Sequence, residues 1–97
     1  MSIVAGSTES VSVNAGEDLT NASSLIVQIQ PKEGEVVSYA ATLQLIDINI
    51  GICEKWYADQ WVKAMVLIEK PGQYRYRLKY IQPGIINHTA WEFLNVT

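Results

Sequence analysis

The chain has 97 residues, which is enough for one domain with a single core. Its apolar content of 48% and its charged content of 18% together argue against a disordered chain. The formal net charge is −3, so approach to the phosphates of a nucleic acid is unfavourable. We therefore expect no nucleic-acid partner.

Cysteine usage and hydropathy indicate a protein made in the cytoplasm. Cys53 is the only cysteine, which excludes an internal disulfide and fits a reducing compartment. The opening residues MSIVAGSTES lack the basic and apolar regions of a signal peptide. No stretch approaches the roughly 20 apolar residues that cross a bilayer, so we expect no membrane partner.

The charges are unevenly placed along the chain. Residues 1–50 carry one base and six acids, for a net charge of −5. Residues 51–97 carry six bases and four acids, for a net charge of +2. This asymmetry favours head-to-tail contact between copies of the chain.

Residues 1–17 are predicted to form a flexible N-terminal arm with one short strand, Glu9–Asn14. The arm holds four apolar residues with almost nothing nearby in sequence to bury them: Ile3, Val4, Val11 and Val13. We expect these residues to add a strand to the open sheet edge of a neighbouring copy. The alternative is that residues 1–8 are only a disordered terminus.

Residues 18–97 are predicted to form a β-sandwich domain. Ser24–Gln30 alternates between apolar and mixed positions, Pro31–Gly34 has the residues of a tight turn, and Val36–Ile46 resumes the alternation. This pattern indicates a β-hairpin. The next segment is ambiguous: a short helical turn is expected near residues 58–63, while residues 65–68 fit a strand equally well.

The clearest strand is Gln73–Ile81, which follows a Pro–Gly turn and precedes another. Tyr74, Tyr76, Leu78 and Tyr80 share the face that we expect in the core, with Leu25, Val27 and Ile29. The opposite face carries Arg75, Arg77 and Lys79. Ile85–Val96 is predicted as the last strand, so the turn spacing favours an all-β sandwich or barrel.

The order of motifs along residues 18–97 resembles that of small structural proteins of tailed-phage virions. The motifs are DLTNAS at 18–23, PKEG at 31–34, KPGQY at 70–74, PG at 83–84, HT at 88–89 and WEFLNV at 91–96. The resemblance is to immunoglobulin-like sandwich proteins akin to the N-terminal domains of baseplate upper proteins. It implies an immunoglobulin-like antiparallel sandwich of about seven strands and a place in a virion. The segment 58–68 is longer than the link usual in that family.

Residues suited to catalysis or metal binding are few. Cys53 and His88 are 35 residues apart, and Cys53 lies in an apolar run that favours a buried, inert thiol. Asp47 stands between two isoleucines, but a loop after the preceding strand explains it more simply than a raised pKa. No spacing of ligands fits a metal, and we expect no catalytic residue, metal or cofactor.

The predicted interface combines the four apolar arm residues with Trp61, Arg75, Arg77 and Lys79. The basic face of Gln73–Ile81 fits either an RNA-binding track or a solvated or protein-facing strand, and the acidic balance favours the second. Trp56 and Trp61 suit a core position, a protein interface or a sugar-binding platform.

The expected function is therefore a non-enzymatic adaptor at the tail baseplate or fibre attachment of a phage virion. Its expected partners are other virion proteins and further copies of the same chain, as a homo-oligomer or in many copies. It would be made in the host cytoplasm. The alternatives are a capsid decoration (cement) protein of the same fold and a carbohydrate-binding module.

Overall fold

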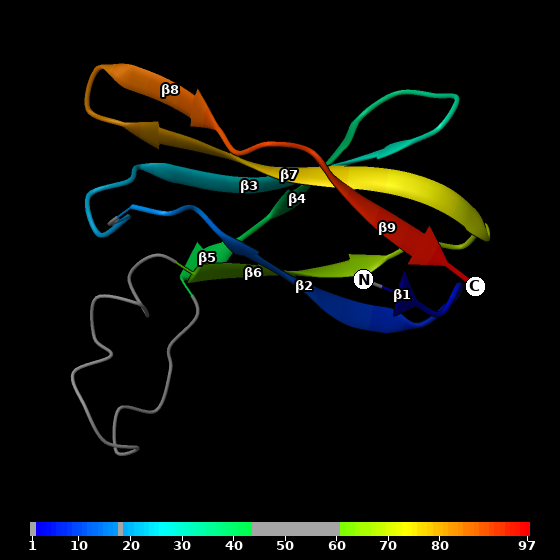
Figure 1. Ribbon diagram of the computed structural model, residues 1–97. Coiled ribbons are helices and arrows are strands. Elements are labelled where there is room, and N and C mark those ends of the chain that lie inside the picture. The colour runs from blue at the N-terminus through cyan, green and yellow to red at the C-terminus, as the bar shows by residue number, and fades with distance from the viewer. Residues whose placement is uncertain (1, 18, 44–60) are drawn as a thin grey trace, which may run out of the picture.

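The computed structural model describes residues 2–17, 19–43 and 61–97, and the regular structure in these ranges is all β (Figure 1). The strands are β1 Ser2–Ile3, β2 Thr8–Asn14, β3 Ser24–Pro31, β4 Val37–Ala40, β5 Thr42–Leu43, β6 Trp61–Leu67, β7 Gly72–Gln82, β8 Ile85–His88 and β9 Glu92–Val96. They form two sheets that pack over one core, which confirms an all-β fold compatible with a sandwich.

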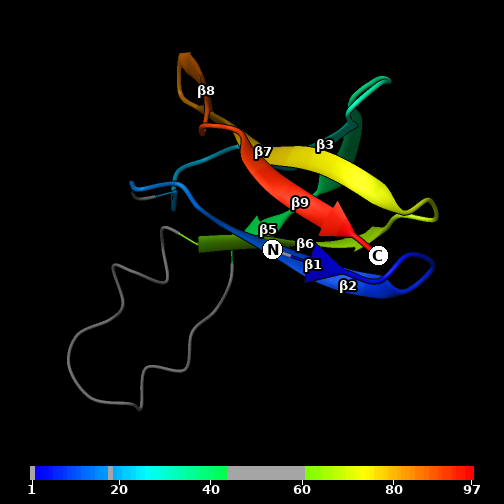
Figure 2. The same ribbon diagram turned by 45° about the vertical axis from the view of Figure 1, so that its right-hand side comes forward.

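The larger sheet, sheet A, has the strand order β1-β9-β7-β3-β4, and β8 also pairs with β7. The smaller sheet, sheet B, has the order β2-β6-β5. All pairings are antiparallel except that of β1 with β9, which is parallel. Figure 2 shows the two layers from a second direction.

The central pair β3–β7 confirms the predicted alternation. Val27 lies opposite Leu78 and Ile29 lies opposite Tyr76, and all four side chains are buried. Each fully buried side chain of this kind contributes about 1.5–3 kcal/mol relative to an exposed one. Because successive side chains point to opposite faces, the same alternation turns the basic residues of β7 away from the core, as predicted.

The predicted helical turn is wrong where the structure describes it, because Trp61–Lys63 begins the strand β6; residues 58–60 lie outside the described ranges. β2 pairs with β6 along all seven of its residues, from Asn14 opposite Trp61 to Thr8 opposite Leu67. Val62, Ala64 and Val66 are buried at every second position, so the strand alternative proposed for residues 65–68 holds for Met65–Leu67.

The predicted hairpin of β3 and β4 is confirmed, but its second strand is shorter than expected. Gly34 in the turn has φ +149°, and a Cβ there would lie 2.7 Å from Cγ of Pro31. After Ala40 the chain leaves sheet A, and Thr42–Leu43 pairs with β6 in sheet B. The expected strand Val36–Ile46 is therefore divided between the sheets, and residues 44–46 lie outside the described part.

The N-terminal segment corrects the expectation of a flexible arm over residues 1–17. β1 pairs with β9 and β2 pairs with β6, so both strands belong to the sheets of this chain. The backbone N–H of Ala5 donates to the carbonyl of Thr97 at 2.9 Å, and that of Gly6 donates to the carbonyl of Ile68 at 2.9 Å. This register brings the first strand beside the last, over 90 residues away in sequence.

The predicted last strand is divided into β8 and β9. Between them, the Thr89 backbone N–H donates to the carbonyl of Leu78, and the Leu78 N–H donates to Oγ1 of Thr89, both at 2.9 Å. Thr89 thus keeps the middle of β7 hydrogen-bonded while the chain bends. The bend places Trp91 beside β7.

Candidate functional site

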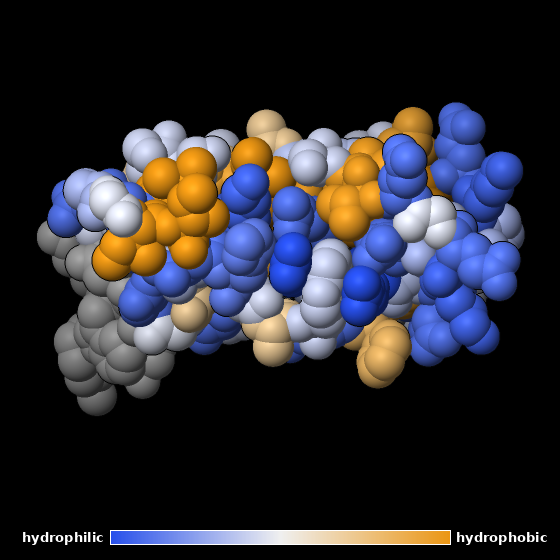
Figure 3. All heavy atoms as spheres, turned by 90° about the horizontal axis from the view of Figure 1, so that it is seen from above, coloured by the Kyte–Doolittle hydropathy of each residue, from blue (hydrophilic) through white to orange (hydrophobic). Residues whose placement is uncertain are grey.

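The outer face of sheet A, which points away from the core, carries a distinctive set of side chains. Cross-strand partners place Gln30, Arg75 and Phe93 in one row and Gln28 and Arg77 in the next. Figure 3 looks onto this face: hydrophobic residues gather near the end where β7 turns into β8 and again toward the opposite end, with hydrophilic residues between them. The face therefore combines charged and apolar groups.

Two arginines on this face share one indole ring. The guanidinium carbons of Arg75 and Arg77 each lie 4.2 Å from the ring centroid of Trp91. Each such contact contributes about 0.5–1 kcal/mol at an exposed site. Trp91 is half-buried, so the indole also fixes where the guanidinium groups stand.

Glutamines of the neighbouring strand hold the same two arginines. Nε and Nη2 of Arg75 donate to Oε1 of Gln30 at 2.9 and 2.6 Å, and Nε of Arg77 donates to Oε1 of Gln28 at 2.8 Å. The two guanidinium groups are thus ordered in the free protein. Ordered side chains lose less rotamer entropy when a partner binds them.

Lys79 and His88 extend the basic face toward β8, where they are cross-strand partners. Burial and the positive charges of Arg77 and Lys79 lower the pKa of His88 below its ordinary value. Like charges disfavour the protonated imidazole. The imidazole is therefore neutral over a wider pH range than an isolated histidine.

Large apolar side chains stand exposed on and beside this face. Phe93 is 71% exposed, and Ile85 and Ile86 of β8 are 55% and 61% exposed. Beside Phe93, a shallow depression of about 370 Å³ is lined by residues that include Lys32 and Arg75. Exposed aromatic and aliphatic groups next to ordered arginines are the composition of a protein-contact surface.

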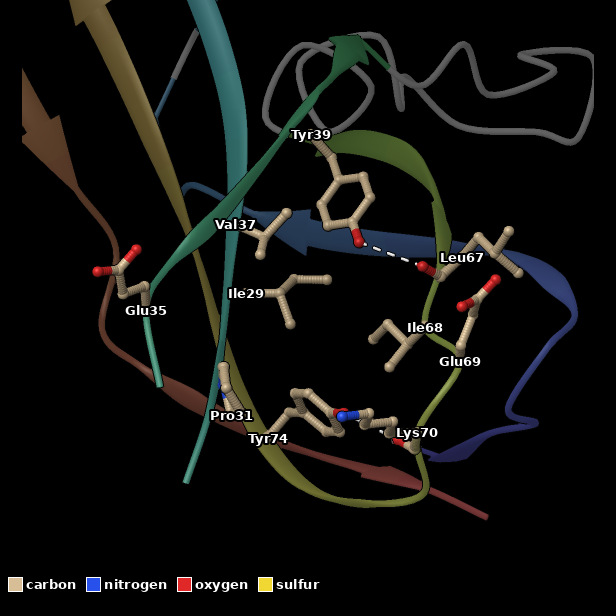
Figure 4. Close-up of a pocket in the computed structure, with 10 residues that line it drawn as sticks. All are labelled: Ile29, Pro31, Glu35, Val37, Tyr39, Leu67, Ile68, Glu69, Lys70 and Tyr74. Carbon is tan, nitrogen blue, oxygen red and sulfur yellow. Dashed lines mark hydrogen bonds between the residues drawn. The ribbon is translucent and has the colours of Figure 1, made fainter. Parts of the chain in front are cut away.

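A second concave region lies between the sheets, beside β4 and the end of β6 (Figure 4). The groove has a volume of about 370 Å³, and its lining includes Ile29, Tyr39 and Ile68, with Glu35 and Glu69 also contributing. The Tyr39 hydroxyl donates to the carbonyl of Leu67 at 3.3 Å across it. This bond ties β4 to the end of β6.

The structure separates the predicted interface residues into two groups. Ile3, Val11 and Val13 are buried in the core of their own chain, so they are not available to a neighbour's sheet edge. Val4 is 54% exposed, and Trp61 is half-buried at the start of β6.

The basic residues of β7 form the other group. Arg75, Arg77 and Lys79 lie together on the outer face of sheet A, as their spacing predicted. Sequence reasoning missed Trp91 and Phe93 as members of this site. For Phe93 the signal was present, because its neighbour Leu94 alternates with Val96 on the buried side.

Features for other chemistries are sparse in the described ranges. No group of three or more His, Cys, Asp or Glu side chains is placed there to hold a metal ion. No helix of that part of the chain has the length and apolarity to cross a membrane. Cys53, Asp47 and Trp56, the residues weighed for a nucleophile, an acid and a sugar platform, lie outside the described residues.

No protein-family model matches the sequence, and no curated protein matches it either. The outer face of sheet A is therefore the structural basis for proposing a function.

Proposed function

We propose that this chain is an immunoglobulin-like structural protein of a tailed-phage virion, acting at the tail baseplate or fibre attachment through protein–protein contacts. The outer face of sheet A is the proposed contact surface. The observation that carries the proposal is Phe93, 71% exposed beside the Arg75–Trp91–Arg77 cluster. The virion setting and the immunoglobulin-like assignment are supported by the resemblance of residues 18–97. Capsid decoration would use the same surface.

The physical chemistry of the face suits binding of a protein. Binding energy at interfaces is concentrated in a few residues, among which tryptophan and arginine are enriched. Here both arginines are already held by glutamines and by the indole, so their ordering costs little on binding. Burial of the Phe93 ring would add the apolar contribution.

Sugar binding by the described tryptophans has less support. Sugars stack on free indole faces, whereas Trp91 is half-buried and carries two guanidinium groups at 4.2 Å. Trp61 is also half-buried, within β6. A protein partner, which uses the guanidinium donors and the phenyl ring together, accounts for more of the observed groups.

Incorporation into particles tests the proposal. Phe93→Glu introduces a charge on the outer face of sheet A, and Met65→Glu introduces the same charge at a residue of sheet B that is 56% exposed. Mass spectrometry of purified particles measures how much of each variant is incorporated. We expect the incorporation of Phe93→Glu to be at least about tenfold below that of the wild type, which corresponds to about 1.4 kcal/mol of binding free energy. Met65→Glu should be incorporated normally. Equal incorporation of both variants, or absence of the wild-type chain from particles, would contradict the proposal.

A further inference from the structure

The outward positions of sheet A carry charge of one sign only. Arg75, Arg77 and Lys79, here called the basic strip, follow one another at every second residue of β7. The outward positions on β3, β4, β8 and β9, which follow from the strand registers, hold no acid. Because the whole chain has a net charge of −3, the rest of it carries a net charge of −6. The strip is therefore a cationic area on an acidic protein.

The basic strip has hydrogen-bond donors that find no acceptor among the described residues. Arg77 uses only Nε, toward Gln28, so its two terminal nitrogens donate no hydrogen bond within the described ranges. Terminal guanidinium nitrogens form short, charge-assisted bonds to carboxylates. A partner that carries a pair of carboxylates can therefore complete the hydrogen bonding of the strip.

This chain offers such a pair in the turn between β3 and β4. Glu33 and Glu35 are both exposed and are two residues apart, the same sequence spacing as Arg75 and Arg77. The turn rises from sheet A on the side away from sheet B in both ribbon views (Figures 1 and 2). The next residue, Val36, is 39% exposed and can contact an aromatic ring on a partner.

We propose that two copies of this chain associate through a reciprocal exchange, in which Glu33 and Glu35 of each copy bind the basic strip of the other. Glu35 borders the groove between the sheets, but its carboxylate points away from that groove in Figure 4. The turn and the strip therefore both face the outer side of sheet A, so the two contacts form together. Such a self-complementary contact closes as a two-fold dimer. The inference names a partner for the contact surface proposed above, and so it rests on that proposed function.

The dimer is expected to be sensitive to salt. Exposed ion pairs are individually weak, and their attraction is screened over about 10 Å at 0.1 M ionic strength. We therefore expect the dissociation constant to rise at least about tenfold between about 0.02 M and 0.3 M salt. In low salt, the full chain should sediment with twice its monomer mass of 10.8 kDa.

Charge-swapped variants of the full chain test the exchange by sedimentation equilibrium. The strip variant is Arg75→Glu with Arg77→Glu, and the turn variant is Glu33→Arg with Glu35→Arg. Each alone should be monomeric in low salt, because both of its contacts would pair like charges. An equimolar mixture should recover the dimer mass, because each contact then pairs opposite charges.

A charge reversal of the same size, placed away from the basic strip, serves as the control. Lys63→Glu with Lys70→Glu makes the same change of charge away from the strip and should leave the dimer intact, and circular dichroism verifies folding of every variant. A monomeric wild type in low salt, an assembly larger than a dimer, or a mixture that stays monomeric would overturn the inference. If Phe93→Glu were still excluded from particles, the proposed function would survive that failure.

Discussion

Truncation of two neighbouring residues of β9 tests the register on which the outer face depends. Leu94 is fully buried opposite Tyr74, whereas Phe93 is 71% exposed opposite Arg75. Removing a buried leucine side chain costs about 2–5 kcal/mol, because apolar contacts are lost and a cavity remains. Truncating an exposed side chain usually changes stability by no more than about 0.5 kcal/mol. We therefore expect Leu94→Ala to be far more destabilising than Phe93→Ala, although phenylalanine is the larger residue.

Urea unfolding in high salt, where the proposed dimer dissociates, measures both free energies of unfolding. For a domain of this length, a loss of about 3 kcal/mol corresponds to a melting temperature lower by about 12–24 °C. The slope of the unfolding free energy against urea concentration should be the same in both variants, so that the urea concentration at half-unfolding reports their stability. If Phe93→Ala were as destabilising as Leu94→Ala, β9 would be shifted by one residue and the outer face would be assigned incorrectly.

Three further predictions concern the groups around this face. A double-mutant cycle of Arg77→Gln and Trp91→Leu should give a coupling of about 0.5–1 kcal/mol in urea unfolding, and no coupling would refute the stacked contact. Arg77→Gln should also raise the pKa of His88, followed by NMR titration, and an unchanged pKa would refute the charge effect. Burial, then the hydrogen bond and charge of Glu92, raise the pKa of Tyr76 from 10.0 to about 12. The contribution of Tyr76 to stability should therefore be complete below about pH 10 and lost as the pH rises toward 12, because the Tyr76 hydroxyl ionises at lower pH in the unfolded chain than in the folded one. Glu92→Gln should lower the pKa of Tyr76, as measured by tyrosinate absorbance.

Alternation within one strand was enough to predict the core face of β7. Three tyrosines and a leucine at every second position gave a single period, and the basic residues followed on the other face. In β6 two periods coincided: Trp61, Ala64, Met65 and Ile68 fit helical spacing, whereas the buried residues alternate as in a strand. β6 is a strand because it pairs with β2 along seven residues. The sequence of the β6 segment alone does not show that this pairing forms.

Long-range pairing also explains what sequence reasoning missed at the N-terminus and at the site. Ile3 finds its partner at Val96, so no local pattern indicates that it is buried. Trp91 reaches the two arginines because the chain bends at Thr89, between β8 and β9. The basic strip could thus be predicted, but the indole that orders it could not.

The outer face of sheet A, the proposed contact surface, should be buried in the assembled particle. Hydroxyl-radical footprinting tests it directly, with Phe93 on sheet A and Met65 on sheet B as internal reporters that are 71% and 56% exposed in the free chain. Oxidation is compared between the free protein in high salt, where the proposed dimer dissociates, and purified particles. We expect strong protection of Phe93 with little change at Met65. Protection of Met65 with Phe93 still oxidised would contradict it.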